Sequence, residues 1–513
     1  MAHWTHQQIL VLGLGNRGRA ACELLVHHGA RVTALDEADT PALRATAAAL
    51  RARGVDTRLA ARALPATRFD LAVLSPAVMQ QHDFVRQLVA RGVPVTGVLE
   101  LAAQQFQCLT MVITGTNGKG TTAELVEQML QDAQRRVMRA GHGARPVCDV
   151  ADHTRELDYL ILQLGVFHLE TVQYFRPAVA VLLNLAPDHL NRYASREDFI
   201  RCAARVFRQQ QAFDWAIVQS EARTQLQALG IPLPAKIITF SATDPRADLY
   251  LDRGLLVSQL PDWTGPLLNM DQCQLRGVHN AENLMAALAV GRVLRVPLES
   301  MVNSLKSCLP GAHRFQVVAE RNGVQFINDS KATNVDATQK ALVSVRPGAG
   351  GQPNVWLIAG GQDKGLDFHE IGPVLNQRVK HAFLLGEAAP KIRAAWGLFT
   401  PCTVVGSLLE AVTEAVKHAT PGDVVLLSPA CSSFDQFRNY QQRGEFFCNA
   451  VQSLGGAVPG DPLPARDFSG PAAAPTAARR RSLPRRLVRE NSGATKPKKP
   501  PHKNPRRPPR QLP

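Results

Sequence analysis

The chain has 513 residues, enough for two to four domains, and its 45% hydrophobic content is ordinary for a globular protein. No run of about 18 apolar residues predicts a membrane span, and the short apolar run at residues 9–14 predicts a buried strand rather than a secretion signal. The nine cysteines are odd in number and lack CxxC pairs. This argues against a disulfide framework or a zinc site and favours a reducing cytoplasm.

The formal net charge of +15 is concentrated near the C-terminus. Residues 479–513 contain 13 Lys or Arg and one acidic residue, so this segment carries +12 and the rest only +3. The preceding chain therefore does not predict a nucleic-acid-binding surface. From about residue 456 onward Pro, Ala, Arg and Lys predominate, and we expect disorder. This tail is either a basic arm that touches anionic lipid or nucleic acid, or a solvated extension.

Short apolar strands alternate with helical patterns along three stretches, at residues 1–107, 108–310 and 311–455. The first stretch has strands near residues 7–15, 30–36 and 69–76. The second has strands near 157–165 and 178–186 and a helix near 279–294. The third has strands near 323–327, 354–359 and 423–427. This alternation predicts an α/β fold with mostly parallel sheets and helices on their faces.

Two glycine-rich turns follow predicted strands. Gly13, Gly15 and Gly18 form a GxGxxG pattern, and Asp36 ends the next strand, as in a dinucleotide-binding fingerprint. This indicates a nucleotide of some kind or only a strand–helix turn, and it does not specify a nicotinamide cofactor.

The second turn, at residues 112–122, reads VITGTNGKGTT and predicts a phosphate loop whose backbone N–H groups wrap a triphosphate. Lys119 would neutralise the outer phosphates. Most such loops place Ser or Thr directly after the lysine to hold magnesium. Here that residue is Gly120, and the hydroxyls follow at Thr121 and Thr122. The alternative is an ordinary glycine-rich turn.

Three strands of the third stretch, which we take as consecutive, each end in a polar or glycine-rich loop, at residues 328–334, 360–364 and 428–437. Ligands bind at the carboxyl ends of strands in open α/β sheets, so the loops together predict one composite site. Each loop alone could be only a turn or a helix cap. Within the third loop, Cys431 is interpreted as a small buried residue. Asp188 and His189 also follow a strand, which suggests a metal-binding, catalytic or structural role.

The combined set of motifs resembles the Mur ligase superfamily, over about residues 9–455. Within it the chain is most similar to the branch that adds D-glutamate to UDP-N-acetylmuramoyl-L-alanine. The discriminating strings are INDSKATN and LLSPACSSFDQF; GLGNRG, GTNGKG, GVHNAEN and GGQDKG also match. The GTNGKG form of the loop is a recognised superfamily variant, shared with folylpolyglutamate synthase.

The resemblance implies three domains: a Rossmann-like domain for the UDP part of the substrate (1–107), a central P-loop ATPase-type domain for ATP (108–310), and a Rossmann-like domain for D-glutamate (311–455). It implies that ATP, with Mg²⁺, converts the substrate carboxylate into an acyl phosphate, which the amine of D-glutamate then attacks. It further implies cytoplasmic synthesis of a peptidoglycan precursor, with roles in cell shape and division. We expect a monomer with small-molecule substrates and no required nucleic acid.

The resemblance also assigns site residues. The ATP-binding set is Gly115, Thr116, Asn117, Gly118, Lys119, Gly120, Thr121, Thr122, Asn283, Arg314, Asp329 and Lys331. The residues implied to bind the UDP part of the substrate are Asn16, Arg17, Asp36 and Ser75. Those implied to bind D-glutamate are Thr333, Lys364, Ser428 and Phe437. Lys119, His189 and Lys364 are the implied catalytic residues. The implied metal ligands are Thr121, Gln163 and His189.

The sequence departs from the family pattern mainly in the second stretch. Gln163 replaces a glutamate that binds magnesium, and Gly165 replaces a residue with a hydroxyl. Ala203 replaces a lysine that is carbamylated, and His142 replaces an asparagine that contacts substrate. Glu170, two helical turns after Gln163, is not expected to reach the same place.

Because magnesium prefers charged or carbonyl oxygen ligands, losing carboxylates should weaken its binding. The sequence therefore leaves open a working D-glutamate ligase with an altered metal site, a pseudoenzyme that binds nucleotide without turnover, and a ligase with a different substrate.

Overall fold

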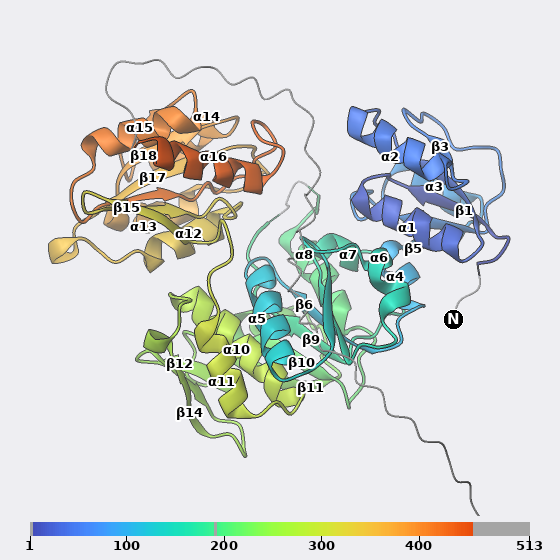
Figure 1. The fold of residues 1–513 in the computed structure, drawn as a ribbon, viewed down its shortest axis with the longest axis horizontal. Coiled ribbons are helices and arrows are strands. Elements are labelled where there is room, and N and C mark those ends of the chain that lie inside the picture. The colour runs from blue at the N-terminus through green and yellow to red at the C-terminus, as the bar shows by residue number, and fades with distance from the viewer. Residues whose placement is uncertain (1–3, 189–191, 455–513) are drawn as a thin grey trace, which may run out of the picture. The chain divides into compact units, whose positions relative to one another are not determined.

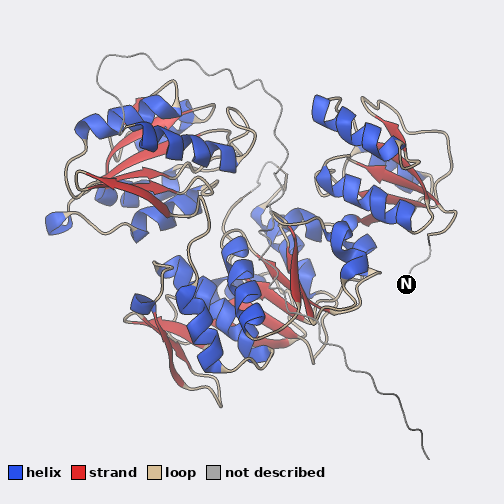
Figure 2. Ribbon diagram, viewed as in Figure 1, coloured by secondary structure: helices blue, strands red, loops and turns tan. Residues whose placement is uncertain are grey.

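The predicted alternation of strands and helices is present throughout the computed structural model, which describes residues 4–188 and 192–454. Its strands form three sheets of five, nine and six strands, with helices packed around each (Figure 1). Figure 2 shows the strands in red and the helices in blue. The predicted α/β class is therefore confirmed. No helix of the described part is long and apolar enough to cross a membrane. The predicted basic tail lies outside the described residues.

The first sheet is fully parallel, in the order β3-β2-β1-β4-β5. Its elements are β1 (Gln8–Leu12), α1 (Asn16–His27), β2 (Arg31–Leu35), α2 (Pro41–Arg51), β3 (Asp56–Arg58), β4 (Leu71–Leu74), α3 (Asp83–Ala90), β5 (Val95–Gly97) and α4 (Val98–Ala103). The apolar residues of β1 are buried on both faces, since Leu10 and Val11 are both fully buried. This explains why the strand is a continuous apolar run and does not alternate.

The GxGxxG turn connects β1 to α1. Gly13 has a φ of +86°, a region that favours glycine. A Cβ at Gly18 would overlap the carbonyl oxygen of Gly13, so only glycine allows α1 to begin this close to the strand. The turn therefore brings the N-terminus of α1 to the carboxyl end of the sheet, where backbone N–H groups can bind an anion.

The central sheet has the order β14-β13-β12-β11-β10-β9-β6-β8-β7. Its strands are β6 (Leu109–Thr114), β7 (Val137–Gly141), β8 (Tyr159–Gln163), β9 (Val179–Leu182), β10 (Trp215–Gln219), β11 (Lys236–Ser241), β12 (Leu249–Asp252), β13 (Leu255–Ser258) and β14 (Gly265–Asn269). The last three pair as antiparallel hairpins, and the others are parallel.

The helices of the central region are α5 (Lys119–Asp132), α6 (Val147–Val150), α7 (Val166–Leu169), α8 (Arg196–Ala203), α9 (Ser220–Ala228), α10 (Val278–Val293) and α11 (Leu298–Ser307). Buried residues of α5, α10 and α11 share one apolar core with one face of the sheet. The opposite face packs with α6, α7 and α8, and that core continues into α1 and α4 of the first region.

The third sheet has the order β15-β16-β20-β17-β18-β19, parallel except for the β15–β16 pair. Its strands are β15 (Gln316–Arg321), β16 (Val324–Asn328), β17 (Val355–Gly360), β18 (Val379–Leu385), β19 (Cys402–Val404) and β20 (Val424–Leu427). Its helices are α12 (Val335–Ser344), α13 (Gly372–Arg378), α14 (Ala389–Trp396), α15 (Leu408–His418) and α16 (Tyr440–Ser453).

This strand order corrects one sequence-based expectation. The three strands that precede the polar loops are not consecutive, because β18 and β19 lie between β17 and β20 in the chain. They are nevertheless neighbours in space, because β20 pairs with β16 on one side and with β17 on the other. All three sheets belong to one compact unit, and the division into domains stays a proposal.

One buried arginine ties the three loops together. Arg443 on α16 is 2% exposed, and its guanidinium donates to five oxygens of the loops that follow β16, β17 and β20. These are the hydroxyl (3.1 Å) and carbonyl (2.9 Å) of Ser330 and the carbonyls of Gly360 (3.4 Å), Cys431 (3.1 Å) and Ser432 (3.3 Å). Burial lowers its pKa to about 10, so it stays charged at neutral pH.

We predict that Arg443→Met lowers the free energy of unfolding by at least about 3 kcal/mol, because it leaves several buried oxygens without a donor. Urea denaturation followed by circular dichroism measures the change. Arg438→Met removes an exposed arginine from the same segment and should change stability by less than about 0.5 kcal/mol. Equal stability of the two variants would contradict this account of the Arg443 contacts.

Candidate active site

Two adjoining cavities lie where the carboxyl ends of the central and third sheets meet. The larger is an open cleft whose space, including the solvent at its mouth, is about 1790 Å³, and it is lined by residues 116–120 of the phosphate loop and by parts of the three polar loops of the third region. The smaller, whose space is about 780 Å³ with open solvent included, shares Asn117, Gly118 and Arg314 with it and extends along α10 and α12. One elongated ligand could therefore lie across both, with its middle at the phosphate loop.

The phosphate loop has the geometry of an anion site. Gly118, just before α5, has a φ of +84°, and the loop curls back around the lysine. The ammonium of Lys119 donates to the carbonyls of Gly115 at 2.7 Å and Thr116 at 2.8 Å. The N-terminus of α5 faces the same cavities, so helix dipole and ammonium together favour a phosphate.

The residues after the lysine have different surroundings. Thr121 lines the smaller cavity, and the guanidinium of Arg314 donates to its hydroxyl at 3.4 Å. Thr122 is fully buried, and its hydroxyl donates to Asn283 Oδ1 at 3.1 Å. A Cβ at Gly120 would overlap the end of the Arg314 side chain. Thr121 is thus the hydroxyl of the loop that remains available at the cavity.

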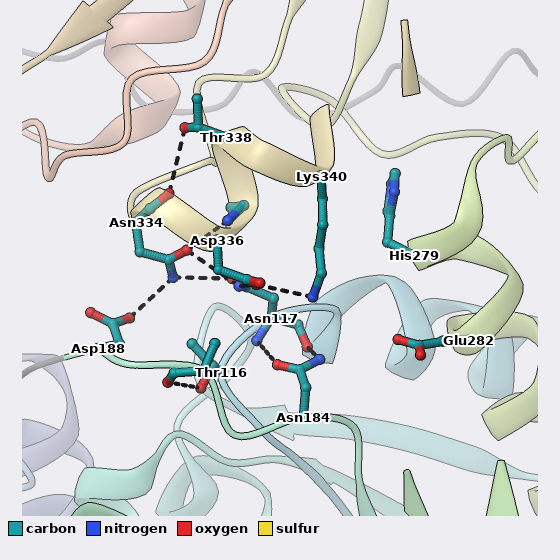
Figure 3. A network of polar contacts seen from close by, with 12 residues as sticks. Thr116, Asn117, Asn184, Asp188, His279, Glu282, Asn334, Asp336, Thr338 and Lys340 are labelled. Carbon is teal, nitrogen blue, oxygen red and sulfur yellow. Dashed lines mark hydrogen bonds and ion pairs between the residues drawn. The ribbon is translucent and has the colours of Figure 1, made fainter. Parts of the chain in front are cut away.

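Asn117 connects the phosphate loop to the third region (Figure 3). Its side-chain amide donates to Asp336 Oδ2 at 2.6 Å and to Asn334 Oδ1 at 3.3 Å, and Asn334 donates back to it at 3.2 Å. On its other side, Asn117 N–H donates to Asn184 Oδ1 at 2.8 Å, and Asn184 Nδ2 donates to the Asn117 carbonyl at 3.1 Å. The tip of the loop is therefore held from both sides.

Four cationic side chains line the larger cavity: Lys119, Arg314, Lys331 and Lys364. Burial lowers the pKa of Lys119 to about 8, although the charge of Asp188 acts in the opposite direction. Burial and then the charges of neighbouring cations lower the pKa of Lys331 to about 7. The carboxylate of Asp188 accepts from Lys364 at 3.2 Å and from Asn334 at 3.4 Å. Glu124 and Glu445 also line this cavity. The cations beside the phosphate loop nevertheless form a local cluster, which favours an anionic ligand there.

The sequence departures of the second stretch differ in their positions. Gln163 ends β8, is 5% exposed and lines the larger cavity together with His142. Ala203 is 2% exposed inside an apolar core and lines neither cavity. The carboxylate of Glu170 is held by Arg192, at 2.6 Å, and by Tyr193, at 2.7 Å. The sequence predicts that Glu170 does not reach the place of the missing glutamate. The structure agrees, because the carboxylate of Glu170 is bound elsewhere.

The predicted amino-acid residues divide into two groups. Thr333 and Lys364 line the larger cavity. Ser428 is fully buried and lines neither cavity; its hydroxyl donates to Asp329 Oδ2 at 3.1 Å. Phe437 also lines neither cavity and packs edge-on against Phe446. Burial raises the pKa of Asp329, at the wall of the smaller cavity, to about 7.

The predicted UDP residues gather at the carboxyl end of the first sheet. Asp36 accepts the backbone N–H of Leu14 at 2.8 Å and so fixes the glycine-rich turn. Asn16 and Arg17 form the first turn of α1, and Ser75 follows β4. Arg17 also reaches the central region, because its Nη2 lies 3.3 Å from Nδ1 of His142.

The described residues offer few ligands for a metal. They contain no group of three or more His, Cys, Asp or Glu side chains that could hold an ion, and the predicted ligand His189 lies outside them. The cavities do present neutral oxygens of Thr121 and Gln163 and the carboxylate of Asp188. This set fits a Mg²⁺ ion that arrives on phosphate oxygens, since such ions need only one or two protein carboxylates. It does not fit an ion held by the protein alone.

The class of the protein follows from comparison with known families. Residues 113–291 match the Mur ligase middle domain, and residues 313–431 match the Mur ligase glutamate ligase domain. Among solved structures, the chain superposes on MurF ligase from Thermotoga maritima with a TM-score of 0.56 and 16% identity, covering 88% of this chain and 96% of that one. The chain superposes on a pseudomurein peptide ligase from Methanothermus fervidus with a TM-score of 0.55 and 14% identity, and the superposition covers 88% of this chain and 100% of that one. These similarities show the fold.

Full-length relatives narrow the class. The UDP-N-acetylmuramoylalanine–D-glutamate ligase of Acidobacterium capsulatum is 37% identical over 456 residues, which cover 88% of this chain and 97% of the relative. The same ligase of Pelotomaculum thermopropionicum is 34% identical, with 88% and 98% covered. The chain belongs to the UDP-N-acetylmuramoylalanine–D-glutamate ligase family of Mur ligases.

The sequence assigns no role to three residues that organise the site, namely Asn184, Asp336 and Arg443, and it includes Asn334 only as part of the polar loop at residues 328–334. A sequence signal existed for Arg443, which shares a helical face with the buried residues Phe447, Ala450 and Val451. A charged residue at that spacing on an apolar face indicates a buried charge with specific partners. The pairing of Asn117 with Asn334 had no comparable signal, because the two are 217 positions apart.

We predict that Asn184→Ala weakens binding of a nucleoside triphosphate about tenfold, because it removes two hydrogen bonds that fix the backbone of the phosphate loop. Isothermal titration calorimetry measures the affinity. Asn449→Ala, at an exposed position of α16, is the control and should bind like the wild type. Unchanged affinity in Asn184→Ala would show that the loop keeps its geometry without this support.

Proposed function

We propose that this chain adds D-glutamate to UDP-N-acetylmuramoyl-L-alanine, driven by ATP and through an acyl phosphate, in the cytoplasmic synthesis of a peptidoglycan precursor. The observation that carries the proposal is the larger cavity, where the phosphate loop, four cationic side chains and the loops of the third region converge. Relatives that share nearly the whole length carry this activity in their names. They give no support to the pseudoenzyme alternative.

The chemistry explains why cations must gather here. A carboxylate does not react with an amine, so one of its oxygens must first become a leaving group, which phosphorylation provides. The carboxylate and the triphosphate are both anions, and their approach requires positive charge. Lys119, Lys331 and Arg314 line the cavity where these groups would meet, and Lys119 is the residue we place at the β- and γ-phosphates.

For ATP, we place the phosphates at the loop and the adenosine in the smaller cavity. Asn283, Arg314 and Asp329 line that cavity, which supports contacts with the base and ribose. Gly115 and Thr122 would act through the shape of the loop, because neither lines a cavity. Mg²⁺, when bound with the nucleotide, would neutralise phosphate charge, and Thr121, Gln163 and Asp188 are the described residues that would hold it.

For D-glutamate, we place a carboxylate at Lys364 and the remainder near Thr333. Ser428 and Phe437 would act indirectly: Ser428 through its hydrogen bond to Asp329, and Phe437 through packing beneath the loop. For the UDP end, we propose Asn16, Arg17, Asp36 and Ser75, since the N-terminus of α1 suits a diphosphate. The same proposal includes one domain for each of these three ligands, at residues 1–107, 108–310 and 311–455. It also includes a monomeric enzyme.

We predict that the purified protein releases phosphate from ATP only when UDP-N-acetylmuramoyl-L-alanine and D-glutamate are both present, and that Lys119→Met lowers kcat at least about 100-fold. A coupled phosphate assay measures both. Lys417→Met, at an exposed position, and L-glutamate in place of D-glutamate are the controls. ATP binding without phosphate release would reject the proposed activity.

We predict that Gln163→Glu lowers the Mg²⁺ concentration needed for half-maximal activity several-fold, because a charged ligand binds the ion more strongly than a neutral amide. Gln163→Leu removes the oxygen and should raise that concentration or abolish turnover. Titrating Mg²⁺ in the phosphate assay separates these outcomes. If the wild type, Gln163→Glu and Gln163→Leu all needed the same Mg²⁺ concentration for half-maximal activity, residue 163 would not be a ligand of the metal. Ala203→Lys is a poorer test, since it buries a charge in an apolar core.

A further inference from the structure

A buried ion pair lies apart from both cavities, between the end of α7 and the residues that precede α8. The guanidinium of Arg192 donates to the carboxylate of Glu170 through Nε at 2.8 Å and through Nη2 at 2.6 Å, and these side chains are only 8% and 12% exposed. The hydroxyl of Tyr193 donates to the same carboxylate at 2.7 Å. Neither member of the ion pair lines a cavity, so the pair does not contact a ligand bound there.

The same pair binds a loop of the first region. Nη1 of Arg192 donates to the carbonyl of Ala77, and Nη2 donates to the carbonyl of Val78, both at 3.3 Å. In the opposite direction, the side-chain amide of Gln80 donates to the backbone carbonyl of Glu170 at 2.7 Å. Three hydrogen bonds therefore hold residues 77–80 to the central region, and two of them come from one guanidinium.

Residues 77–80 belong to a loop that packs on the glycine-rich turn of the first sheet. The loop follows β4 and begins with Ser75, whose backbone N–H donates to the carbonyl of Leu12 at 3.0 Å. A Cβ at Gly13 would lie 3.0 Å from Cβ of Ser75 and 3.1 Å from Cγ2 of Val78. The loop thus touches the turn where we place the UDP end, and a shift of the loop would change the shape of that site.

An arginine is needed to make these contacts at once. The bonds to Glu170, Ala77 and Val78 use four of its five N–H groups. The planar fork fits the carboxylate on one side, and the remaining N–H groups reach the two carbonyls. A lysine would keep a positive charge beside Glu170, but three donors on a single nitrogen cannot be spread over the same three partners.

The segment between β9 and α8, which contains Arg192, also supports the phosphate loop. Asn184 fixes the backbone of Asn117, and the carbonyl of Ala186 accepts the hydroxyl of Thr116 at 2.8 Å. Described residues of one segment therefore bind the phosphate loop at one place and the loop of the first region at another.

We propose that Arg192, held by Glu170, is a positioning residue for the UDP-bearing substrate. It fixes residues 77–80 on the glycine-rich turn, so that the loop needs no ordering when the substrate binds. Arg192 itself touches no substrate. The inference rests on the proposed function and adds to it a determinant of affinity for one of the three substrates. Its loss should weaken that substrate selectively, since neither ATP nor D-glutamate is placed in the first region.

Calorimetric binding of UDP-N-acetylmuramoyl-L-alanine and steady-state ligation together test this role. We predict that Arg192→Met raises the Kd and the KM for this substrate about tenfold, while kcat and the KM values for ATP and D-glutamate stay within about threefold. Arg192→Lys should still bind the substrate at least about threefold more weakly than the wild type, because it cannot reach both carbonyls. Parallel changes in all three KM values would indicate a merely structural role and overturn the proposal.

A variant on the other side of the contact leaves the ion pair intact. Gln80→Ala deletes the exposed amide that donates to Glu170 and should raise the Kd for the UDP-bearing substrate about threefold. Gln81→Ala and Arg196→Met, at exposed neighbouring positions, are the matched controls and should bind like the wild type.

The contrary outcomes are distinct. Wild-type affinity in Arg192→Met, or in both Arg192→Lys and Gln80→Ala, overturns the positioning role; if Arg192→Met does not fold, the other two variants decide. A wild type that neither binds UDP-N-acetylmuramoyl-L-alanine nor ligates rejects the proposed function and this inference with it. A wild type that binds this substrate without ligating rejects the proposed activity, and the Kd values still decide the role of Arg192. A wild type that ligates, with unchanged affinity in the variants, rejects only the role of Arg192.

Discussion

The site depends on the burial of a single charge. Within the described residues Arg443 forms no ion pair with a carboxylate, and its guanidinium is satisfied by oxygens of three loops. A charge withdrawn from water is tolerated only when its hydrogen bonds are made, so the guanidinium imposes one mutual arrangement on those loops. Ser330, Gly360 and Ser432 cannot shift independently, and the neighbouring residues that face the larger cavity inherit that arrangement. The loops that line the larger cavity are therefore held together by a residue that does not line it.

Much of the fold follows from local patterns. Continuous apolar runs predict the buried parallel strands, and glycine spacing predicts both anion-binding turns, since these depend on residues close in sequence. The composite site of the third region was predicted from loops that follow strands, although the order of those strands was wrong. Strand order is decided by packing across the whole sheet, and no local pattern encodes that β20 lies between β16 and β17. For the same reason the contact of Asn117 with Asn334 and Asp336 had no signal in the sequence.

Electrostatics also bear on the proposed function of the altered central region. The sequence departures remove negative charge from positions that the family resemblance assigns to metal binding, while four cationic side chains line the cavity beside the phosphate loop. Asp188 contributes a carboxylate, paired with Lys364, and Gln163 retains an oxygen at the cavity wall. We therefore propose that side-chain cations do part of the neutralisation that metal ligands would otherwise provide. Ala203 is buried in an apolar core.

The position of β20 has a consequence for how the enzyme is made. The strand at the centre of the third sheet is the last of its strands to be synthesised, and α16 with Arg443 follows it. Until this segment leaves the ribosome, β16 and β17 each have one edge without its partner strand. Both edges then pair with β20, which is far from them in the sequence, so long loops must be closed. The part of the larger cavity that the third region forms should thus be assembled only after α16 has been translated. A nascent chain would carry a complete phosphate loop well before it could ligate anything.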